Sequence, residues 1–228
     1  MKEWLMNCTN IMRLNHEENF KFSACQKTEV FGMKIGLDMD EVITSFVDTY
    51  LPYYNKNHGT DWKKEDIYSY YLYEVFGISK EEDTKSIVSF GETEEYKNMP
   101  LIEGAADGIR KLSRKNELYI ITGRPFDRRE ITEEAIRKNF NNCFKGLFFT
   151  DFKAERGHAV PKHTICNDLG IELMIDDMPS TAEEIYNYCN IPIIMPEYPW
   201  NKNFDIHGTK ISRVNGWKGI MKYCRESL

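Results

Sequence analysis

The strongest constraint on the fold of this chain is a short apolar segment that ends in two aspartates. Residues 34–37 (KIGL) lead directly into Asp38, Met39 and Asp40. Side chains alternate along a β-strand, but at its carboxyl end the backbone leaves the pleat and both carboxylates can turn toward one crevice. Two carboxylates so close repel each other unless a cation or a shared proton lies between them. The segment therefore predicts a divalent metal and phosphate chemistry at the end of a strand.

Length and charge narrow the class of protein further. The 228 residues suit one α/β domain, or a core with a modest insertion, and a hydrophobic content of 41% is enough for a buried core. The formal net charge of −6 argues against binding to a nucleic acid polymer, because that affinity rests mainly on cationic contacts to phosphates. There is no run of 18 apolar residues, so we expect no membrane span. A small anionic substrate at a local positive site is compatible with this composition.

The cysteines indicate a reducing compartment. They are scattered, without a CxxC pair or a zinc-like spacing to histidine: Cys8, Cys25, Cys143, Cys166, Cys189 and Cys224. Residues 1–15 lack the continuous apolar region of a signal peptide. We therefore predict a cytoplasmic protein with buried thiols. The sequence carries no signal for its oligomeric state.

The chain divides into three regions by pattern. Residues 1–32 are polar without a clear period, which predicts a weakly ordered extension, with a helix packed on the core as the competing interpretation. Residues 45–100 are helical in pattern and rich in aromatics, which predicts a helical cap inserted after the first strand. Residues 33–44 and 101–228 then form the core domain.

Strands and helices alternate in the second part of the core. Strands are predicted at 117–122, 146–149, 171–175 and 191–195, and helices at 105–115, 128–139, 162–169, 180–188 and 217–225. In the cap, helices are predicted from about 43 to 54, at 63–73 and at 79–90. Alternation of this kind is typical of parallel strands joined by crossover helices. We therefore predict an α/β fold with a doubly wound, Rossmann-like parallel sheet.

Residues with carboxylate, hydroxyl or ammonium groups recur at strand ends and helix starts, on the side where such sheets bind ligands. Beside Asp38 and Asp40 they are Thr122, Lys162 and the pair Asp176-Asp177. Each has an ordinary structural explanation: a turn after a strand, a solvated lysine, a helix cap. Two acidic pairs on separate apolar strands, with a hydroxyl and an ammonium between them in sequence, are hard to explain by structure alone.

The set suits phosphoryl transfer through an aspartyl-phosphate. Asp38 would attack phosphorus as a carboxylate nucleophile, and Asp40 would protonate the leaving oxygen and later take a proton from water. Mg²⁺ would bind to oxygens of Asp38, the Asp40 carbonyl and the pair Asp176-Asp177. The hydroxyl of Thr122 and the ammonium of Lys162 would hold the phosphate oxygens as charge spreads over them.

Residues 33–225 resemble a phosphohydrolase of the haloacid dehalogenase superfamily. The first motif matches Asp38 to Val42, the second Ile120 to Thr122, the third Lys162 and the fourth Met174 to Asp177. Aligned with the family's fourth motif, Asp177 falls on the metal ligand and Asp176 is the second choice. One departure is Glu41, which stands where the family usually has glycine. Lys153 is a rival for the third motif, although no convincing helix follows it.

Within the superfamily, the chain resembles the 5'(3')-deoxyribonucleotidase-like branch and its bacterial nucleotidases. The residues that carry this resemblance are Met99 to Ala105, the run Ile-Thr-Gly-Arg-Pro from Ile121 and Ile175-Asp176-Asp177. The resemblance implies an enzyme that hydrolyses (deoxy)nucleoside 5'-monophosphates. The alternatives are a phosphatase for a sugar phosphate or another small metabolite and, more remotely, a phospho-acceptor module or a catalytically silent relative.

Further candidates have two interpretations each. Gly123 and Arg124 directly follow Thr122, so they are candidates for phosphate binding, while Arg124 would equally suit a structural carboxylate. The tyrosines of the cap would stack on a nucleobase or pack the cap onto the core: Tyr50, Tyr53, Tyr54, Tyr68, Tyr70, Tyr71 and Tyr73. The segment 196–201 follows a strand and could border the crevice, but a surface loop is its default assignment.

Overall fold

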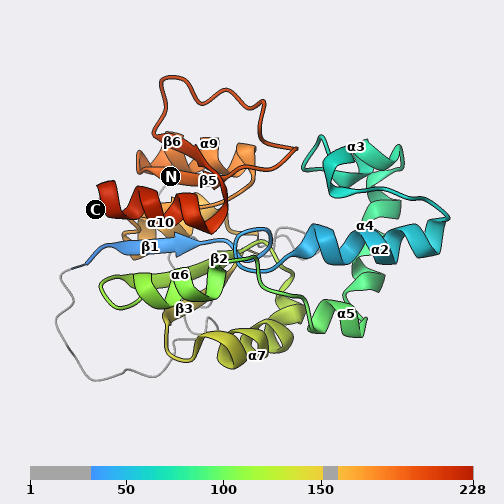
Figure 1. The fold of residues 1–228 in the computed structure, drawn as a ribbon, viewed down its shortest axis with the longest axis horizontal. Coiled ribbons are helices and arrows are strands. Elements are labelled where there is room, and N and C mark those ends of the chain that lie inside the picture. Colours follow the sequence, from blue (N-terminus) through green and yellow to red (C-terminus); the bar gives the residue numbers. More distant parts are fainter. Residues whose placement is uncertain (1–31, 151–158, 228) are drawn as a thin grey trace, which may run out of the picture.

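The core of the molecule is a six-stranded parallel sheet (Figure 1). The computed structural model describes residues 32–150 and 159–227. The strands are β1 (Lys34–Leu37), β2 (Glu117–Thr122), β3 (Phe144–Phe149), β4 (Leu173–Ile175), β5 (Ile193–Pro196) and β6 (Ile211–Val214), in the order β3-β2-β1-β4-β5-β6. The doubly wound α/β prediction is therefore confirmed. Residues 1–31 of the predicted extension (1–32), and Lys153, lie outside the described residues.

Helices cover both faces of the sheet. On one face lie α6 (Ala105–Leu112), α7 (Arg129–Phe140) and α10 (Gly216–Ser227), and on the other α8 (Lys162–Leu169) and α9 (Pro179–Cys189). The alternation of strand side chains explains this division. In β1, Ile35 and Leu37 pack on the face that α6, α7 and α10 cover. Gly36 lies toward the other face, where an added Cβ would stand 2.6 Å from Met174 Sδ. The sheet is thus buried on both faces, as parallel sheets usually are.

The elements between β1 and α6 are helical throughout. They are α2 (Phe46–His58), η1 (Lys64–Asp66), α3 (Leu72–Phe76), α4 (Lys80–Phe90) and α5 (Glu94–Lys97), and we call residues 45–100 the cap. The chain enters and leaves the cap along adjacent paths, because Ser45 N donates to Pro100 O at 2.9 Å. The cap lies beyond the carboxyl ends of the strands (Figure 1). The predicted bounds of the cap and the division of the chain into domains stay predictions.

Two local predictions were wrong, and one strand was not predicted. The helix expected over 63–73 is the short turn η1 followed by α3, since the aromatic run between them favours helix weakly. Ser180 does not cap α9, because the helix begins one residue earlier with Pro179, whose fixed φ suits the first helical position. Strand β6 was not predicted, because its four residues carry little apolar pattern.

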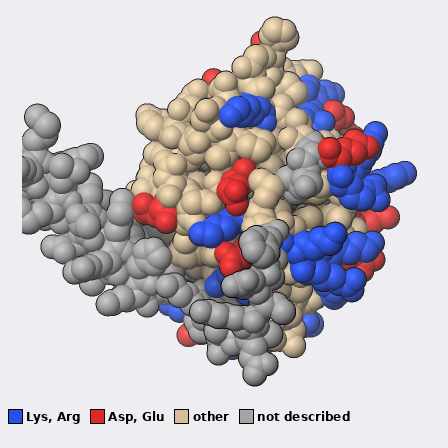
Figure 2. Space-filling model, turned by 90° about the vertical axis from the view of Figure 1, so that its left-hand side faces the viewer, with Lys and Arg blue, Asp and Glu red and all other residues tan. Residues whose placement is uncertain are grey.

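The face opposite the cap is mixed in charge. Figure 2 shows lysine and arginine side chains gathered mainly on one half of this face, with acidic side chains between them. None of the helices in the described part of the chain is long and apolar enough to cross a membrane.

Candidate active site

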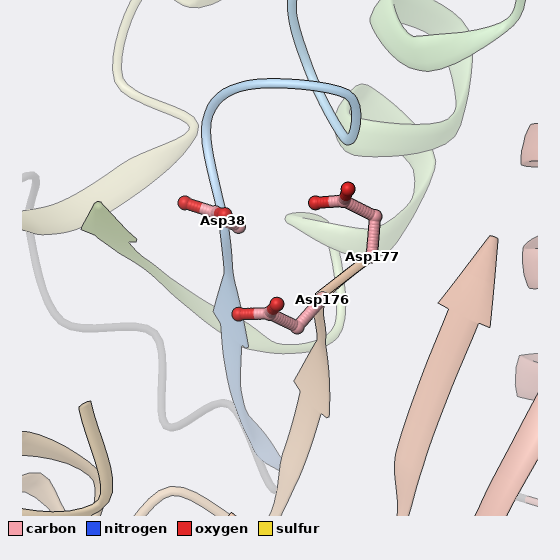
Figure 3. A group of neighbouring side chains, drawn as sticks. All are labelled: Asp38, Asp176 and Asp177. Atoms are coloured by element: carbon pink, nitrogen blue, oxygen red, sulfur yellow. The ribbon is translucent and has the colours of Figure 1, made fainter. Parts of the chain in front are cut away.

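The pairing of β1 with β4 places three carboxylates together. Leu37 lies opposite Ile175, and Asp38 N donates to Ile175 O at 2.9 Å, so Asp38 and Asp176 leave the sheet side by side (Figure 3). With Asp177 they form a buried triad in which one oxygen from each lies within 4.8 Å of the others. Neighbouring parallel strands end at the same edge of the sheet, so residues 138 positions apart meet here.

Lys162 neutralises part of this charge. It is the first residue of α8, and its Nζ lies 2.8 Å from Asp38 Oδ2 and 2.7 Å from Asp176 Oδ2. Burial by itself would lower the pKa of Lys162, but the two carboxylates outweigh burial and raise it. The ammonium is therefore held charged between the two aspartates. The predicted third-motif lysine is thus brought to the predicted first and fourth motifs.

Three carboxylates share one ammonium in the triad, so they are difficult to ionise together. Burial raises the pKa of Asp38 to about 7, with Lys162 opposing this and Asp176 and Asp40 adding to it. Burial also raises the pKa of Asp177 well above its usual range, and Asp176 and Asp38 add to the shift. A buried set of three carboxylates that favours protonation without a cation is chemically suited to a hard divalent cation such as Mg²⁺.

The two fourth-motif aspartates differ in their partners. Asp176 accepts from Lys162 Nζ on Oδ2 and from Met178 N at 3.0 Å on Oδ1. Asp177 accepts from Trp200 Nε1 at 2.9 Å on Oδ2, and among the described residues no donor binds its Oδ1. The occupied oxygens of Asp176 favour Asp177 as the direct metal ligand.

Asp40 faces a different partner. Arg124 Nε lies 2.9 Å from its Oδ2 and Arg124 Nη2 lies 2.6 Å from its Oδ1, and Thr44 Oγ1 donates to Oδ1 at 2.9 Å. The Arg124 side chain is 4% exposed and also donates to Thr132 Oγ1. Of the two interpretations of Arg124, the structure shows the pairing with a carboxylate. The carboxylate of Asp40 is not part of the triad, and its carbonyl stays a predicted ligand.

Thr122 and Gly123 lie where β2 ends, next to β1 in the sheet. Thr122 is buried and its Oγ1 accepts from Arg124 N at 3.2 Å, which fixes the turn that follows the strand. Both residues line the same cavity as Asp38 and Lys162. The predicted phosphate-binding positions are therefore close to the predicted nucleophile, while their contacts to a phosphate stay a prediction.

Glu41 explains how the chain does without the usual glycine. Its φ is +58°, a left-handed conformation that costs a non-glycine residue about 1–2 kcal/mol. Its buried carboxylate accepts from Val47 N at 2.6 Å, in the first turn of α2, and pairs with Lys64 Nζ at 2.9 Å. Ser45, the residue before α2, makes no capping bond with its own side chain. Glu41 therefore caps the first helix of the cap from outside it.

The segment 196–201 is part of the site, so its default assignment as a surface loop was wrong. Trp200 is 8% exposed and Asn201 is fully buried. Asn201 Nδ2 donates to Asp177 O and to Pro196 O, at 2.9 and 2.8 Å, and Tyr198 Oη donates to Glu41 O at 2.8 Å. The available sequence signal was a loop with two large aromatics directly after a buried strand.

A cavity of about 1160 Å³ lies between the cap and the carboxyl ends of the strands. Its walls include Asp38, Lys162, Tyr70, Tyr71 and Tyr73. Tyrosines on α2 behave differently, since Tyr50 and Tyr54 are buried in the cap's own hydrophobic cluster. Tyr50 and Tyr54 therefore have a packing role, while stacking of Tyr70, Tyr71 and Tyr73 on a nucleobase stays a prediction.

Tyr70 extends from the cap toward the triad. The residue is 41% exposed as a whole, yet burial raises the pKa of its hydroxyl well above the usual value, and Asp177 and Asp38 add to the shift. Tyr70 therefore lines the same cavity as Asp38 and Asp177, and its hydroxyl experiences their negative charge.

The profile of one protein family matches residues 32–225, and this family is described as "5' nucleotidase, deoxy (Pyrimidine), cytosolic type C protein". The chain is 28% identical over 186 residues to "Putative nucleotidase YqfW" of Bacillus subtilis (strain 168), which covers 81% of this chain and 90% of that protein. Among solved structures it is similar to a haloacid dehalogenase-like hydrolase from Streptococcus pneumoniae, with a TM-score of 0.62, 14% identity, and coverage of 85% and 98% of the two chains. A second is the "HAD-hydrolase YfnB from Bacillus subtilis bound to magnesium", with a TM-score of 0.55, 15% identity, and coverage of 86% and 99%.

Proposed function

Because this chain belongs to the family of cytosolic type C 5' (deoxy, pyrimidine) nucleotidases, within the haloacid dehalogenase superfamily, we propose that it hydrolyses nucleoside 5'-monophosphates through Asp38. The chain is thus an enzyme of the phosphatase and nucleotidase class, and the proposal concerns its substrate and mechanism. The observation that carries it is the bridge from Lys162 to Asp38 and Asp176, beside a cavity that Asp38 and Lys162 line. We keep the cytoplasm as the predicted compartment.

The first chemical step forms an aspartyl-phosphate. A carboxylate oxygen of Asp38 attacks phosphorus in line, the ester P–O bond breaks, and Asp40 gives its proton to the leaving nucleoside oxygen. Thr122 and Lys162 hold the phosphate oxygens while charge spreads over them. Lys162 already contacts Asp38 at 2.8 Å, so attacking oxygen and phosphate would share one cationic group.

The second step releases phosphate. A water molecule attacks the phosphorus of the aspartyl-phosphate, Asp40 takes its proton, and the bond from phosphorus to the Asp38 oxygen breaks. Asp38 and Asp40 return to their starting states, so the net reaction consumes one water per ester. Arg124 binds both oxygens of Asp40, which fixes the orientation of the carboxylate that accepts the proton of water in this step.

The carboxylates of Asp38 and Asp177, with Asp176 and the Asp40 carbonyl in support, would hold Mg²⁺. When bound, the ion supplies positive charge that offsets the repulsion between carboxylates and phosphate. The clustering of three buried carboxylates supports this assignment, as does the magnesium bound to the Bacillus subtilis hydrolase of similar fold.

The nucleotide assignment is supported by the family and by the aromatic wall of the cavity. A volume of about 1160 Å³ is more than a phosphate needs and is sufficient for a nucleoside monophosphate. Tyr70, Tyr71 and Tyr73 present flat side chains there, and aromatic rings stack on any nucleobase.

The test is phosphate release with Mg²⁺ from nucleoside monophosphates, sugar phosphates and para-nitrophenyl phosphate. Asp38→Asn is run beside the wild type, with Asp107→Asn, on the exposed face of α6, as the matched control. Release from nucleotides that disappears in Asp38→Asn and in EDTA would support the proposal. Preferential release from sugar phosphates would withdraw the nucleotide claim, and full turnover in EDTA would rule out the metal.

A further inference from the structure

We propose that Trp200 is a positioning residue that aims the carboxylate of Asp177 at the metal ion. The inference rests on the proposed function, because it takes Asp177 as a metal ligand. Trp200 Nε1 donates to Asp177 Oδ2 at 2.9 Å, and both residues are buried. An aspartate has two oxygens that can exchange places by rotation. A fixed donor on Oδ2 selects one orientation and leaves Oδ1 for the cation.

The loop that carries Trp200 is tied to the backbone of the same aspartate. Asn201 Nδ2 donates to Asp177 O at 2.9 Å and Asn201 Oδ1 accepts from Tyr198 N at 2.9 Å. The segment that carries the indole therefore cannot move away from Asp177 without breaking the bond from Asn201 to the Asp177 carbonyl. Both the main chain and the side chain of the proposed ligand are held by one short segment.

The Trp200 ring also packs with residues of the cap. Trp200 packs in the cap's hydrophobic cluster and stacks on Tyr198, with ring centroids 4.5 Å apart and an angle of 11°. Lys64 Nζ, from the cap, lies 4.7 Å from the centre of the Tyr198 ring and 2.9 Å from Glu41 Oε2. Trp200 thus packs with residues of the cap, while its N–H binds a residue of the core.

Trp200→Phe separates the donor from the packing, because phenylalanine keeps a stacked ring and lacks the N–H. The matched control is Trp62→Phe, since Trp62 packs on Phe76 in the cap and has no contact with the triad among the described residues. Mg²⁺ binding to the EDTA-treated, dialysed protein is measured by calorimetry without substrate. We expect Trp200→Phe to raise the Kd by about 10-fold to 100-fold, the range for groups that orient metal ligands. Trp62→Phe should stay within about 2-fold of the wild type.

A second measurement, on the wild-type protein, tests the inference even if Trp200→Phe does not fold. In isotope-labelled wild-type protein, the assigned indole N–H signal of Trp200 should shift on Mg²⁺ titration and saturate at the calorimetric Kd. In the folded variant, phosphate release should recover as Mg²⁺ is raised, which a purely structural defect would not allow. Unchanged Mg²⁺ affinity in folded Trp200→Phe, or an unmoved indole signal, overturns the inference. If the wild type itself binds no Mg²⁺, the proposed function fails instead.

Discussion

Arg124 donates hydrogen bonds to both carboxylate oxygens of Asp40, with Nε 2.9 Å from Oδ2 and Nη2 2.6 Å from Oδ1. The guanidinium also lies 5.3 Å from the centre of the Tyr96 ring, which belongs to the cap. The planar guanidinium pairs with the charge of a carboxylate and also fixes its rotation. A lysine ammonium can pair with the charge but cannot fix the rotation. The residue that follows the second motif therefore orients the acid and base group of the first motif.

Arg124→Lys tests this relationship. Because lysine keeps the charge and loses the fork, we expect kcat to fall about 10-fold to 100-fold, which is at or below the lower end of the roughly 100-fold to 10,000-fold that acid–base catalysis contributes. KM should change by less than about 3-fold, because ground-state binding is not the interaction removed. Arg129→Lys, which replaces an arginine paired with Glu133 on α7, serves as the control. A large rise in KM at constant kcat would instead make Arg124 a phosphate ligand.

Asp38→Asn tests the nucleophile. The amide cannot form the aspartyl-phosphate, so turnover should fall by more than about 1000-fold. The fold should persist, because the change removes one of three buried, mutually repelling carboxylates. Phosphate release and circular dichroism are measured on the same preparation. Activity at the wild-type level would exclude Asp38 as the nucleophile.

The pH dependence of stability follows from the raised pKa of Asp38, which is about 7 in the metal-free fold. An aspartate in the unfolded chain titrates near 4, so between pH 4 and 7 the folded state binds more protons and stability decreases as pH rises. In EDTA, the Tm of Asp38→Asn minus that of the wild type should therefore grow from pH 5 to pH 8. A difference that stays flat across this window would contradict the pKa shift.

Glu41→Gly tests the departure from the family pattern. Glycine would relieve the left-handed φ, worth about 1–2 kcal/mol. It would also remove a charged acceptor from the start of α2, where such a bond is worth about 1.5–3 kcal/mol, together with the partner of Lys64. We expect a net loss of about 1–2 kcal/mol, or a fall in Tm of about 2–8 °C. The Tm of Glu41→Gln, which keeps an acceptor, should lie between those of the wild type and Glu41→Gly. A Tm of Glu41→Gly above that of the wild type would show that the backbone strain outweighs the lost bonds.

Much of the site was predictable because its signals are local. Each motif residue follows an apolar strand or begins a helix, and parallel strands end at one edge, so Asp38, Thr122 and Asp177 could be brought together without coordinates. Lys162 was predictable as the start of α8, with the same bounds as found. The sheet itself follows from alternating apolar strands and amphipathic helices, both short-range patterns.

The remaining contacts join residues that no local pattern relates. Arg124 and Asp40 are 84 positions apart, and Trp200 and Asp177 are 23 apart in a segment that resembles a surface loop. The left-handed Glu41 is stable because Lys64 and Val47 N come to its carboxylate from the cap. The sequence alone therefore determined the fold and the chemical groups at the strand ends, since periodicity and position carry both. Only the tertiary structure decided which partner holds each group, because those pairings depend on how the cap packs against the core.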